Sequence, residues 1–359
     1  MKQYENKYLR NSKCLLYLLL LLFSSILMTV SGCSLRQKQG TASEEDTIAH
    51  IKLKSCNSIY YWRTVFNPSD KELAFLKEQD IRRMYLRMFD VMQDLKKRTV
   101  PNATIKFKRR MPDNIEVVPV VFIVKDVFES SAKDSSQIKT LASQIVERVT
   151  RMCSWNGIVH WNEIQLDCDW TPNTRNAFYL LCKNVRKQLP KEKLLSSTIR
   201  LHQLNQPAPP VNCGVLMAYN TDNFRDPRTF NSILNDNTVK TYLSKAKSFD
   251  LPLDIALPIF RWNLVFDKSG KFKRIAAYTK ESAYPIQTDN EEWSQTDSEK
   301  NGEIYKLEVV PYATILKTQK LIEQYLGLQK GTYSTILYHL NETNINAYTN
   351  DEIKSLYHN

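Results

Sequence analysis

The chain has 359 residues, of which 42% are hydrophobic and 25% are charged, so it is neither mainly disordered nor a multi-pass membrane protein. Only 8 residues are glycine and no short period repeats, which excludes collagen and disfavours solenoids and propellers. The formal net charge is +12, but its only short basic clusters, at 96–98 and 106–110, lie in no nucleic-acid-binding motif. We therefore expect no nucleic-acid partner.

The N-terminus has the pattern of a targeting segment. Residues 1–13 are polar and basic, residues 14–30 are mostly apolar, and Ser31, Gly32 and Cys33 follow. This order is typical of a secretory signal peptide, and the apolar run is at the short limit for a bilayer span. We expect a signal peptide over residues 1–32, and a single N-terminal membrane anchor is the alternative.

The end of this segment resembles the lipobox of bacterial lipoproteins, in the residues Val30-Ser31-Gly32-Cys33. The resemblance implies that Cys33 is acylated and becomes the first residue of the mature chain, so the membrane is a partner through an N-terminal lipid. Ser34 stands where a retention signal would carry Asp, which favours the outer membrane of the cell envelope, on a face that the sequence leaves open. Residues 33–55 are then the lipidated cysteine and a polar tether.

From residue 58 onward, short apolar runs alternate with amphipathic segments. The expected strands are 58–63, 83–89, 115–123, 163–169, 195–204, 213–220, 253–260 and 333–340. The expected helices begin after a cap at Ser69 and cover 135–152, 174–189 and 239–249, with a strand and a helix over 303–326. This alternation predicts an α/β fold, a (β/α)8 TIM-type barrel over 56–359 with an irregular insertion near 268–312. An open doubly wound sheet is the alternative, although no glycine-rich nucleotide turn follows an early strand.

Beyond Cys14 and Cys33 the chain has five cysteines, which match no zinc-binding spacing. We expect buried free thiols, and a Cys168–Cys182 disulfide is the alternative. The histidines His160 and His202 are too isolated to suggest a metal site. We expect neither a metal nor another cofactor.

The fourth expected strand carries polar side chains, and burying such groups inside a barrel without partners costs free energy. Side chains alternate along a strand, so Gln165, Asp167 and Asp169 share the face that points into the barrel. Function gathers at the C-terminal ends of barrel strands. Two neighbouring carboxylates favour a neutral, proton-donating acid beside an ionised one, which is the arrangement of general acid catalysis. Alternatively, both acids bind arginines and hold the barrel together.

This strand resembles the D-x-x-D-x-D-x-E signature of family 18 glycoside hydrolases, which are chitinase-like proteins. The four signature positions fall on Asn162, Gln165, Asp167 and Asp169, and only Asp167 is retained. The resemblance implies that Asp169, shorter by one methylene than the family's Glu, is the catalytic acid. Asp167 would tune that acid and orient an acetamido group or a water molecule.

The sixth expected strand adds a second partial match. Its residues Met217-Ala218-Tyr219-Asn220 resemble the M-x-Y-D of the same family, with Asn220 in place of the Asp. The resemblance implies that Tyr219 contacts the acetamido group of a substrate. More broadly, residues 58–265 resemble uncharacterised glycoside-hydrolase-like lipoproteins of Bacteroidetes, in the runs YYWRTVFN, YLRMFDV, IQLDCDWT, STIRLHQL and GVLMAYN. That resemblance implies a barrel and an export address, with no settled activity.

Other polar and aromatic residues near the strand ends complete a candidate substrate site. Arginines can neutralise buried carboxylates or bind an anionic sugar, His202 can act as an acid–base partner, and flat aromatic rings stack on sugar faces. The candidates are Arg63, Arg87, Arg200, His202, Trp170 and Trp262, in addition to Gln165, Tyr219 and Asn220. Each also has an ordinary structural role as its alternative.

These observations lead to three hypotheses, and they leave open whether the chain is an enzyme. In the first, an exported lipoprotein binds a glycan and hydrolyses it, with Asp169 as the proton donor; no second Glu is placed, so the substrate would have to assist. In the second, the barrel is catalytically inactive and binds a glycan or an envelope partner. In the third, it is a structural envelope lipoprotein without a ligand cleft.

Overall fold

The computed structural model describes residues 48–131, 134–246, 249–276, 297–300 and 302–357. The expected signal peptide, Cys33 and most of the expected tether lie outside the described residues. Among the described residues, none of the helices is both long and apolar enough to cross a bilayer.

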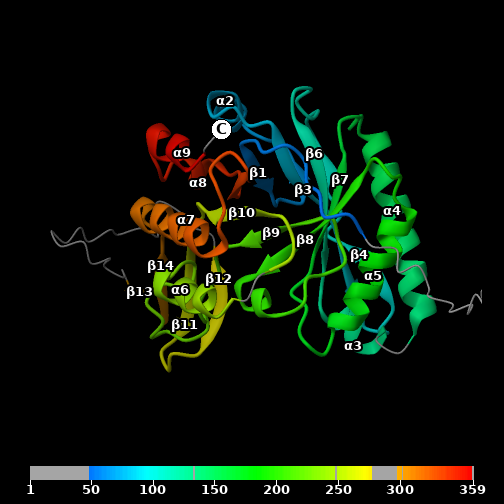
Figure 1. Cartoon of the computed structure of the whole chain (residues 1–359). Helices are drawn as coiled ribbons and strands as arrows, with labels where there is room; N and C mark the ends of the chain where they lie inside the picture. The colour runs from blue at the N-terminus through cyan, green and yellow to red at the C-terminus, as the bar shows by residue number, and fades with distance from the viewer. Residues whose placement is uncertain (1–47, 132–133, 247–248, 277–296, 301, 358–359) are drawn as a thin grey trace, which may run out of the picture. The chain divides into compact units, whose positions relative to one another are not determined.

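A closed barrel of eight parallel strands forms the centre of the fold, which confirms the predicted barrel and excludes the open sheet (Figure 1). Around the barrel the strands are β1 (Ser58–Tyr61), β3 (Arg83–Gln93), β6 (Glu116–Ile123), β7 (Glu163–Asp167), β8 (Leu194–Arg200), β9 (Cys213–Met217), β10 (Leu253–Pro258) and β15 (Thr335–Tyr338). The ring closes because β1 pairs in parallel with both β15 and β3. Nearly every residue of these strands is buried, as expected for parallel strands covered on both faces.

Helices connect the strands and cover the outside of the barrel. They are α2 (Asp70–Glu78), α3 (Asp126–Ser131), α4 (Ser135–Trp155), α5 (Arg175–Gln188), α6 (Asp236–Lys245), α7 (Tyr312–Leu326), α8 (Glu342–Ile345) and α9 (Asn350–Leu356). The start of α2 was predicted from Ser69, and the structure confirms a capping box: the Ser69 hydroxyl accepts from the Glu72 backbone N–H, and the Glu72 carboxylate accepts from the Ser69 N–H.

The prediction of a strand over 195–204 was wrong beyond Arg200. There the chain turns into a short 3₁₀ helix, η1 (Leu201–Asn205). The Gln203 side chain fixes the turn, because its Oε1 accepts from the Arg200 backbone N–H and its Nε2 donates to the Trp170 carbonyl. His202 is therefore on a turn at the end of β8 and not on a strand.

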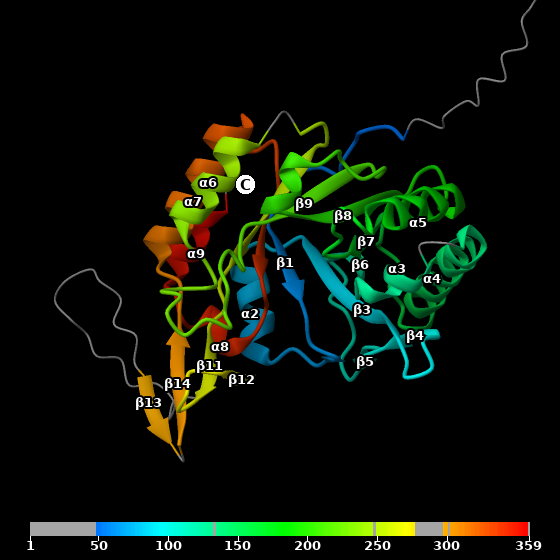
Figure 2. The same ribbon diagram turned by 90° about the horizontal axis from the view of Figure 1, so that it is seen from below.

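Additional short strands lie outside the barrel, near the C-terminal ends of the barrel strands. They are β2 (Val65–Phe66) paired with β5 (Lys106–Phe107), β4 (Thr99–Asn102) beside β3, and the antiparallel sheet of β11 (Trp262–Asp267), β12 (Phe272–Ala276), β13 (Asp297–Lys300) and β14 (Glu303–Glu308). The sequence predicted a strand and a helix over 303–326, which β14 and α7 confirm, but it did not predict β11, β12 or β13. Figure 2 shows this second sheet projecting beside the barrel.

The described cysteines are free thiols, and all except Cys56 are buried. Because they are unpaired, the alternative of a Cys168–Cys182 disulfide does not hold in this structure. Burial raises the pKa of the Cys168 thiol well above its ordinary value. These thiols act as small apolar side chains of the core.

At the end where the strands begin, a carboxyl group is enclosed in the barrel. Glu163 is fully buried, and the Ser196 hydroxyl donates to its Oε1 at 2.5 Å. The nearby Arg83 is engaged elsewhere, because its Nε donates to Glu116 at 2.8 Å and its Nη2 donates to the Lys54 carbonyl at 3.0 Å. Burial raises the pKa of Glu163 to about 7, and Arg83 offsets only part of that effect.

This raised pKa makes the stability of the barrel depend on pH. A folded-state pKa above the unfolded value favours folding at low pH, and the contribution is lost as the pH rises through about 7. We expect the free energy of unfolding to fall by up to about 3 kcal/mol between pH 5 and pH 8, and Glu163→Gln to abolish most of this slope. Urea unfolding of both proteins across this range measures it. An equal slope in the two proteins would show that Glu163 does not cause the pH dependence of stability.

Candidate functional site

A cavity of about 520 Å³ opens at the end of the barrel where the strands finish. Residues that follow β7, β8 and β9 form its floor and sides, and residues of β11 and β12 form an outer wall. The lining residues that matter here are Asp169, Arg200, His202, Tyr219, Asn220, Asp222 and Trp262. Six of these seven were already chosen from the sequence, and the structure brings those six together.

Asp169 and His202 form a polar pair in this cavity. Asp169 lies beyond the end of β7, and His202 lies on η1, which follows β8. The His202 Nε2 is 3.6 Å from the Asp169 Oδ1, and the two side chains are 47% and 60% exposed. Water and a ligand can therefore reach both groups.

Asp167 has a different environment, although it is only two residues away. Its carboxylate is buried and accepts from the Thr198 hydroxyl at 2.7 Å and from Arg200 Nη2 at 3.1 Å. Burial is the largest single effect on Arg200 and lowers its pKa, but Asp167 and the weaker contributions of Tyr219, Asp169 and Tyr60 together raise that pKa overall. The two acids thus do not project together into open solvent, because β7 ends at Asp167 and the chain changes direction.

Tyr219 and Asn220 connect the cavity to the centre of the barrel mouth. The Tyr219 ring stacks on Tyr338 with 4.9 Å between the ring centroids, and its hydroxyl lies 3.5 Å from the Met217 sulfur. Burial raises the pKa of Tyr219 far above its ordinary value, so its hydroxyl stays protonated. Asn220 is exposed and adopts a φ of 53°, a left-handed conformation that Asn tolerates better than most residues.

Aromatic rings close the mouth of the barrel around Tyr338. Trp62 and Phe260 both have ring centroids 5.6 Å from that of Tyr338, and Phe260 contacts Trp262 at 5.2 Å. The Trp262 indole N–H donates to the buried Glu308 carboxylate at 3.0 Å, which fixes its ring. The barrel centre is thus filled, and the accessible space lies on the rim beside Trp262.

A second cavity of about 440 Å³ adjoins the first. The two share Asn220, Trp262 and Ile275, and the second extends toward the residues that follow β15. Its other polar lining groups are Arg261, His339, Asn341, Thr343 and Asn344. The pKa of His339 is lowered to about 4, mainly by burial and also by the nearby Arg63, so this imidazole is neutral at pH 7. Together the two cavities form a rim with aromatic walls, on which charged side chains such as Asp169 and Asp222 lie beside neutral hydrogen-bonding groups.

Besides Asp167, four residues predicted for the site lie outside these cavities. Gln165 is fully buried and accepts from the Tyr60 hydroxyl at 2.6 Å. Arg87 donates to Asp90 through two nitrogens and lies over the Trp62 ring. Trp170 is fully buried. The structure therefore gives each of these three a role in packing, against its predicted contact with substrate.

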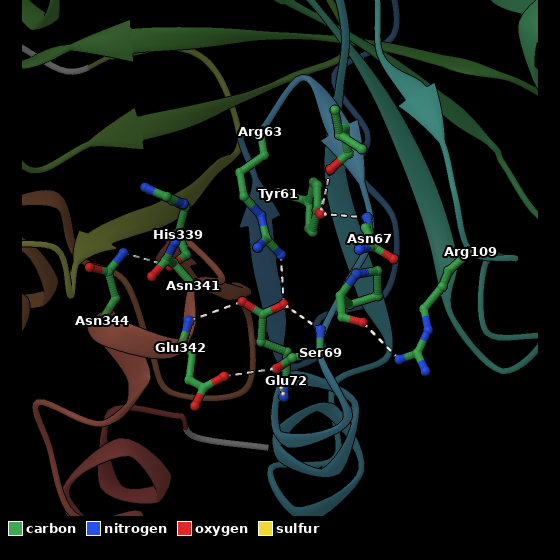
Figure 3. Close-up of polar contacts among 12 residues, drawn as sticks. Tyr61, Arg63, Asn67, Ser69, Glu72, Arg109, His339, Asn341, Glu342 and Asn344 are labelled. Carbon is green, nitrogen blue, oxygen red and sulfur yellow. Dashed lines mark hydrogen bonds and ion pairs between the residues drawn. The ribbon is translucent and has the colours of Figure 1, made fainter. Parts of the chain in front are cut away.

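Arg63 is the fourth, and its network is shown in Figure 3. Arg63 Nη2 donates to Glu72 Oε2 at 2.6 Å, and the other oxygen, Glu72 Oε1, accepts from the Glu342 backbone N–H at 3.0 Å. The Ser69 hydroxyl donates to the Glu342 carboxylate at 3.1 Å. Arg63 therefore joins the segment after β1 to α2 and α8 and lines neither cavity, and its role in substrate binding stays a prediction.

The sequence interpretation missed Asp222, the second carboxylate of the first cavity. It follows β9, and it accepts from the Thr238 hydroxyl at 3.0 Å. The polar run Asn220-Thr221-Asp222-Asn223 directly after an apolar strand was the signal that pointed to it. Within the described residues, no three His, Cys, Asp or Glu side chains are grouped so that they could hold a metal ion.

No family profile and no curated protein matches the sequence. Solved structures do match. The spore cortex-lytic enzyme SleL of Bacillus cereus superposes with a TM-score of 0.54 at 14% identity, over 84% of this chain and 74% of that one. A chitinase from Chromobacterium violaceum gives 0.51 at 13% identity, over 84% and 97%. A chitinase from Bacteroides thetaiotaomicron gives 0.51 at 12% identity, over 86% and 96%.

The chain has a chitinase-like barrel fold. The distant resemblance to family 18 glycoside hydrolases inferred from Asp167 and Tyr219 is thereby confirmed for the fold. Identities this low carry no activity with them, so function has to be argued from the cavity itself.

Because Asp167 is buried and Asp169 is exposed, the same substitution of Asp by Asn should change the free energy of unfolding much more at Asp167 than at Asp169. Asp167→Asn removes the charge that neutralises the largely buried Arg200, and we expect it to lower the free energy of unfolding by about 2–3 kcal/mol. Asp169→Asn changes an exposed side chain, so its effect should stay within about 0.5 kcal/mol. Denaturant unfolding of both variants checks this. Equal losses would show that Asp169 is also a structural residue.

Proposed function

We propose that this protein binds a glycan in the first cavity, at the end of the barrel where the strands finish. The observation that carries the proposal is the pairing of the exposed acid Asp169 with His202 beside the fixed ring of Trp262. Sugars combine apolar ring faces with many hydroxyls, so an aromatic wall next to hydrogen-bonding groups fits them. The chitinase-like fold of the neighbours supports the same class of ligand.

Trp262 would stack on a sugar ring, and the polar groups would form hydrogen bonds with the ligand. Trp262 is held at its indole nitrogen, which leaves the ring positioned to stack on a sugar. Asn220, Asp222 and His202 line the same space and can exchange hydrogen bonds with hydroxyl or amide groups. Because Asn220 and Trp262 also line the second cavity, a ligand of more than one sugar unit would extend across both.

A second candidate function, hydrolysis of the bound glycan, is favoured by the Asp169–His202 pair. Asp169 would give a proton to the glycosidic oxygen, and His202, 3.6 Å away and half exposed, would replace that proton from solvent. Asp222 in the same cavity would be the second carboxylate that glycoside hydrolysis commonly needs. Asp167 would hold Arg200 in place without touching the ligand.

We also propose that the protein is attached to the cell envelope through a lipid on Cys33. The support is the basic, apolar and small-residue order of residues 1–33, followed by a polar segment. A lipid-anchored glycan-binding barrel would act on material in the envelope or outside the cell.

Binding can be tested with a panel of soluble oligosaccharides that includes N-acetylglucosamine oligomers and peptidoglycan fragments. Isothermal titration calorimetry should detect binding of at least one member. We expect Trp262→Ala to weaken that binding at least tenfold, because a stacking surface is lost. Trp155→Ala, which removes an exposed indole at the other end of the barrel, should leave it unchanged. A protein that binds no member of the panel contradicts the proposal.

Hydrolysis is tested on the bound oligosaccharide by measuring the release of reducing ends. We expect Asp169→Asn to lower the rate at least 100-fold, as the loss of a general acid does, while Kd stays within about threefold. His202→Gln should shift the pH profile of the rate. A native protein that binds an oligosaccharide and cleaves none would leave the binding function standing and remove the catalytic one.

A further inference from the structure

The end of the barrel where the strands begin, opposite the cavities, gathers exposed apolar side chains. Of the seven large exposed apolar residues in the described part of the chain, four belong to segments at this end: Ile51, Trp155, Val159 and Tyr325. Ile51 precedes β1, Trp155 ends α4, Val159 precedes β7, and Tyr325 is in the last turn of α7. Trp155 and Val159 are close in the chain, and we call these two residues the basal patch.

The basal patch includes side chains that are costly to leave in water. Trp155 is 76% exposed and Val159 is 77% exposed, and only three residues separate them in the chain. The Arg151 guanidinium lies 5.9 Å from the Trp155 ring centroid. Nearby, Lys193 Nζ lies 3.7 Å from the Trp161 ring centroid. Tryptophan beside basic side chains is the composition of a membrane–water interface.

Charged groups of both signs occur in the segments at this end of the barrel. Asp80 binds Arg82 at 2.5 Å, and Asp250 lies 3.7 Å from His50. Lysines in the segments that lead into the strands are Lys54, Lys191, Lys193 and Lys330. A lysine near an anionic membrane surface is attracted to it.

The described chain also begins at this end of the barrel. Its first residues are fixed across the strand starts: the Ala49 carbonyl accepts from Asn212 at 2.9 Å, and Lys52 binds Asp254 at 2.7 Å. Residues 34–47, between Cys33 and Ile48, span at most about 50 Å even when fully extended. A lipid on Cys33 would therefore keep the start of the described chain within that distance of the bilayer.

We propose that the basal patch lies on the lipid bilayer, with Trp155 and Val159 in the interface. This orientation rests on the lipid anchor at Cys33 proposed above and is independent of glycan binding. The glycan cavity would then point away from the membrane, because it lies at the opposite end of the barrel. The ligand would be a glycan presented from beyond the membrane surface and not a sugar on a lipid headgroup.

The test uses the full lipidated protein reconstituted into vesicles of phosphatidylethanolamine and phosphatidylglycerol that carry brominated acyl chains. Bromine quenches indole fluorescence only at contact with the bilayer. We expect brominated vesicles to quench part of the native tryptophan emission, and Trp155→Phe to abolish most of that difference. Trp262→Phe, the same change at the other end of the barrel, should retain it.

Two controls separate the orientation from the anchor. Cys33→Ser should remove flotation of the protein with vesicles, whereas Trp155→Phe should not. A native protein that floats but shows the same quenching in Trp155→Phe would overturn the orientation while the anchor stands. A native protein that does not float overturns both. A dimer in detergent that Trp155→Phe dissociates would assign the basal patch to a second copy of the chain and overturn the proposal.

Discussion

The ion pair between Arg200 and Asp167 fixes the arrangement of charges at the mouth of the barrel. Arg200 ends β8 and reaches the carboxylate that ends β7, so the charge inside the barrel mouth is neutralised within the protein. Tyr219 and Tyr338 then pack as a ring pair at the mouth. The accessible space lies on the rim, where the Asp169 and His202 side chains are exposed. A buried charge pair of this kind fixes geometry more than it adds stability.

The barrel was predictable from the sequence because its strands are short, apolar and separated by amphipathic helices. The inward direction of Gln165 and Asp167 also followed from alternation. That alternation did not extend to Asp169, because β7 ends at Asp167, and the end of a strand depends on hydrogen bonds to its neighbours rather than on its own residues. The turn at His202 depends on a bond from Gln203 to Trp170, which local sequence does not reveal. For the same reason Trp170 and Arg63 were placed in the site although the structure uses them elsewhere.

The similarity to chitinases and to SleL is a similarity of fold. At the position of the glutamate in the family 18 signature this chain has the shorter acid Asp169, which lies beyond the end of β7 and on the rim. Asp222 brings another carboxylate to the same space from the segment after β9. An unusual acid arrangement on a familiar barrel is consistent with the general rule that function belongs to the site and not to the fold.

The sheet of β11 to β14 forms part of the pocket wall although it lies outside the eight-stranded ring. It enters after β10 and returns to the barrel through α7, so its strands pair only with one another and none is part of the eight-stranded ring. Strand β12 has no buried residue, which is why hydrophobic periodicity did not predict it. Yet Trp262 on β11 and Ile275 on β12 line both cavities. A substitution at the exposed positions of this sheet would therefore reshape the pocket wall without changing the pairing of the eight-stranded ring.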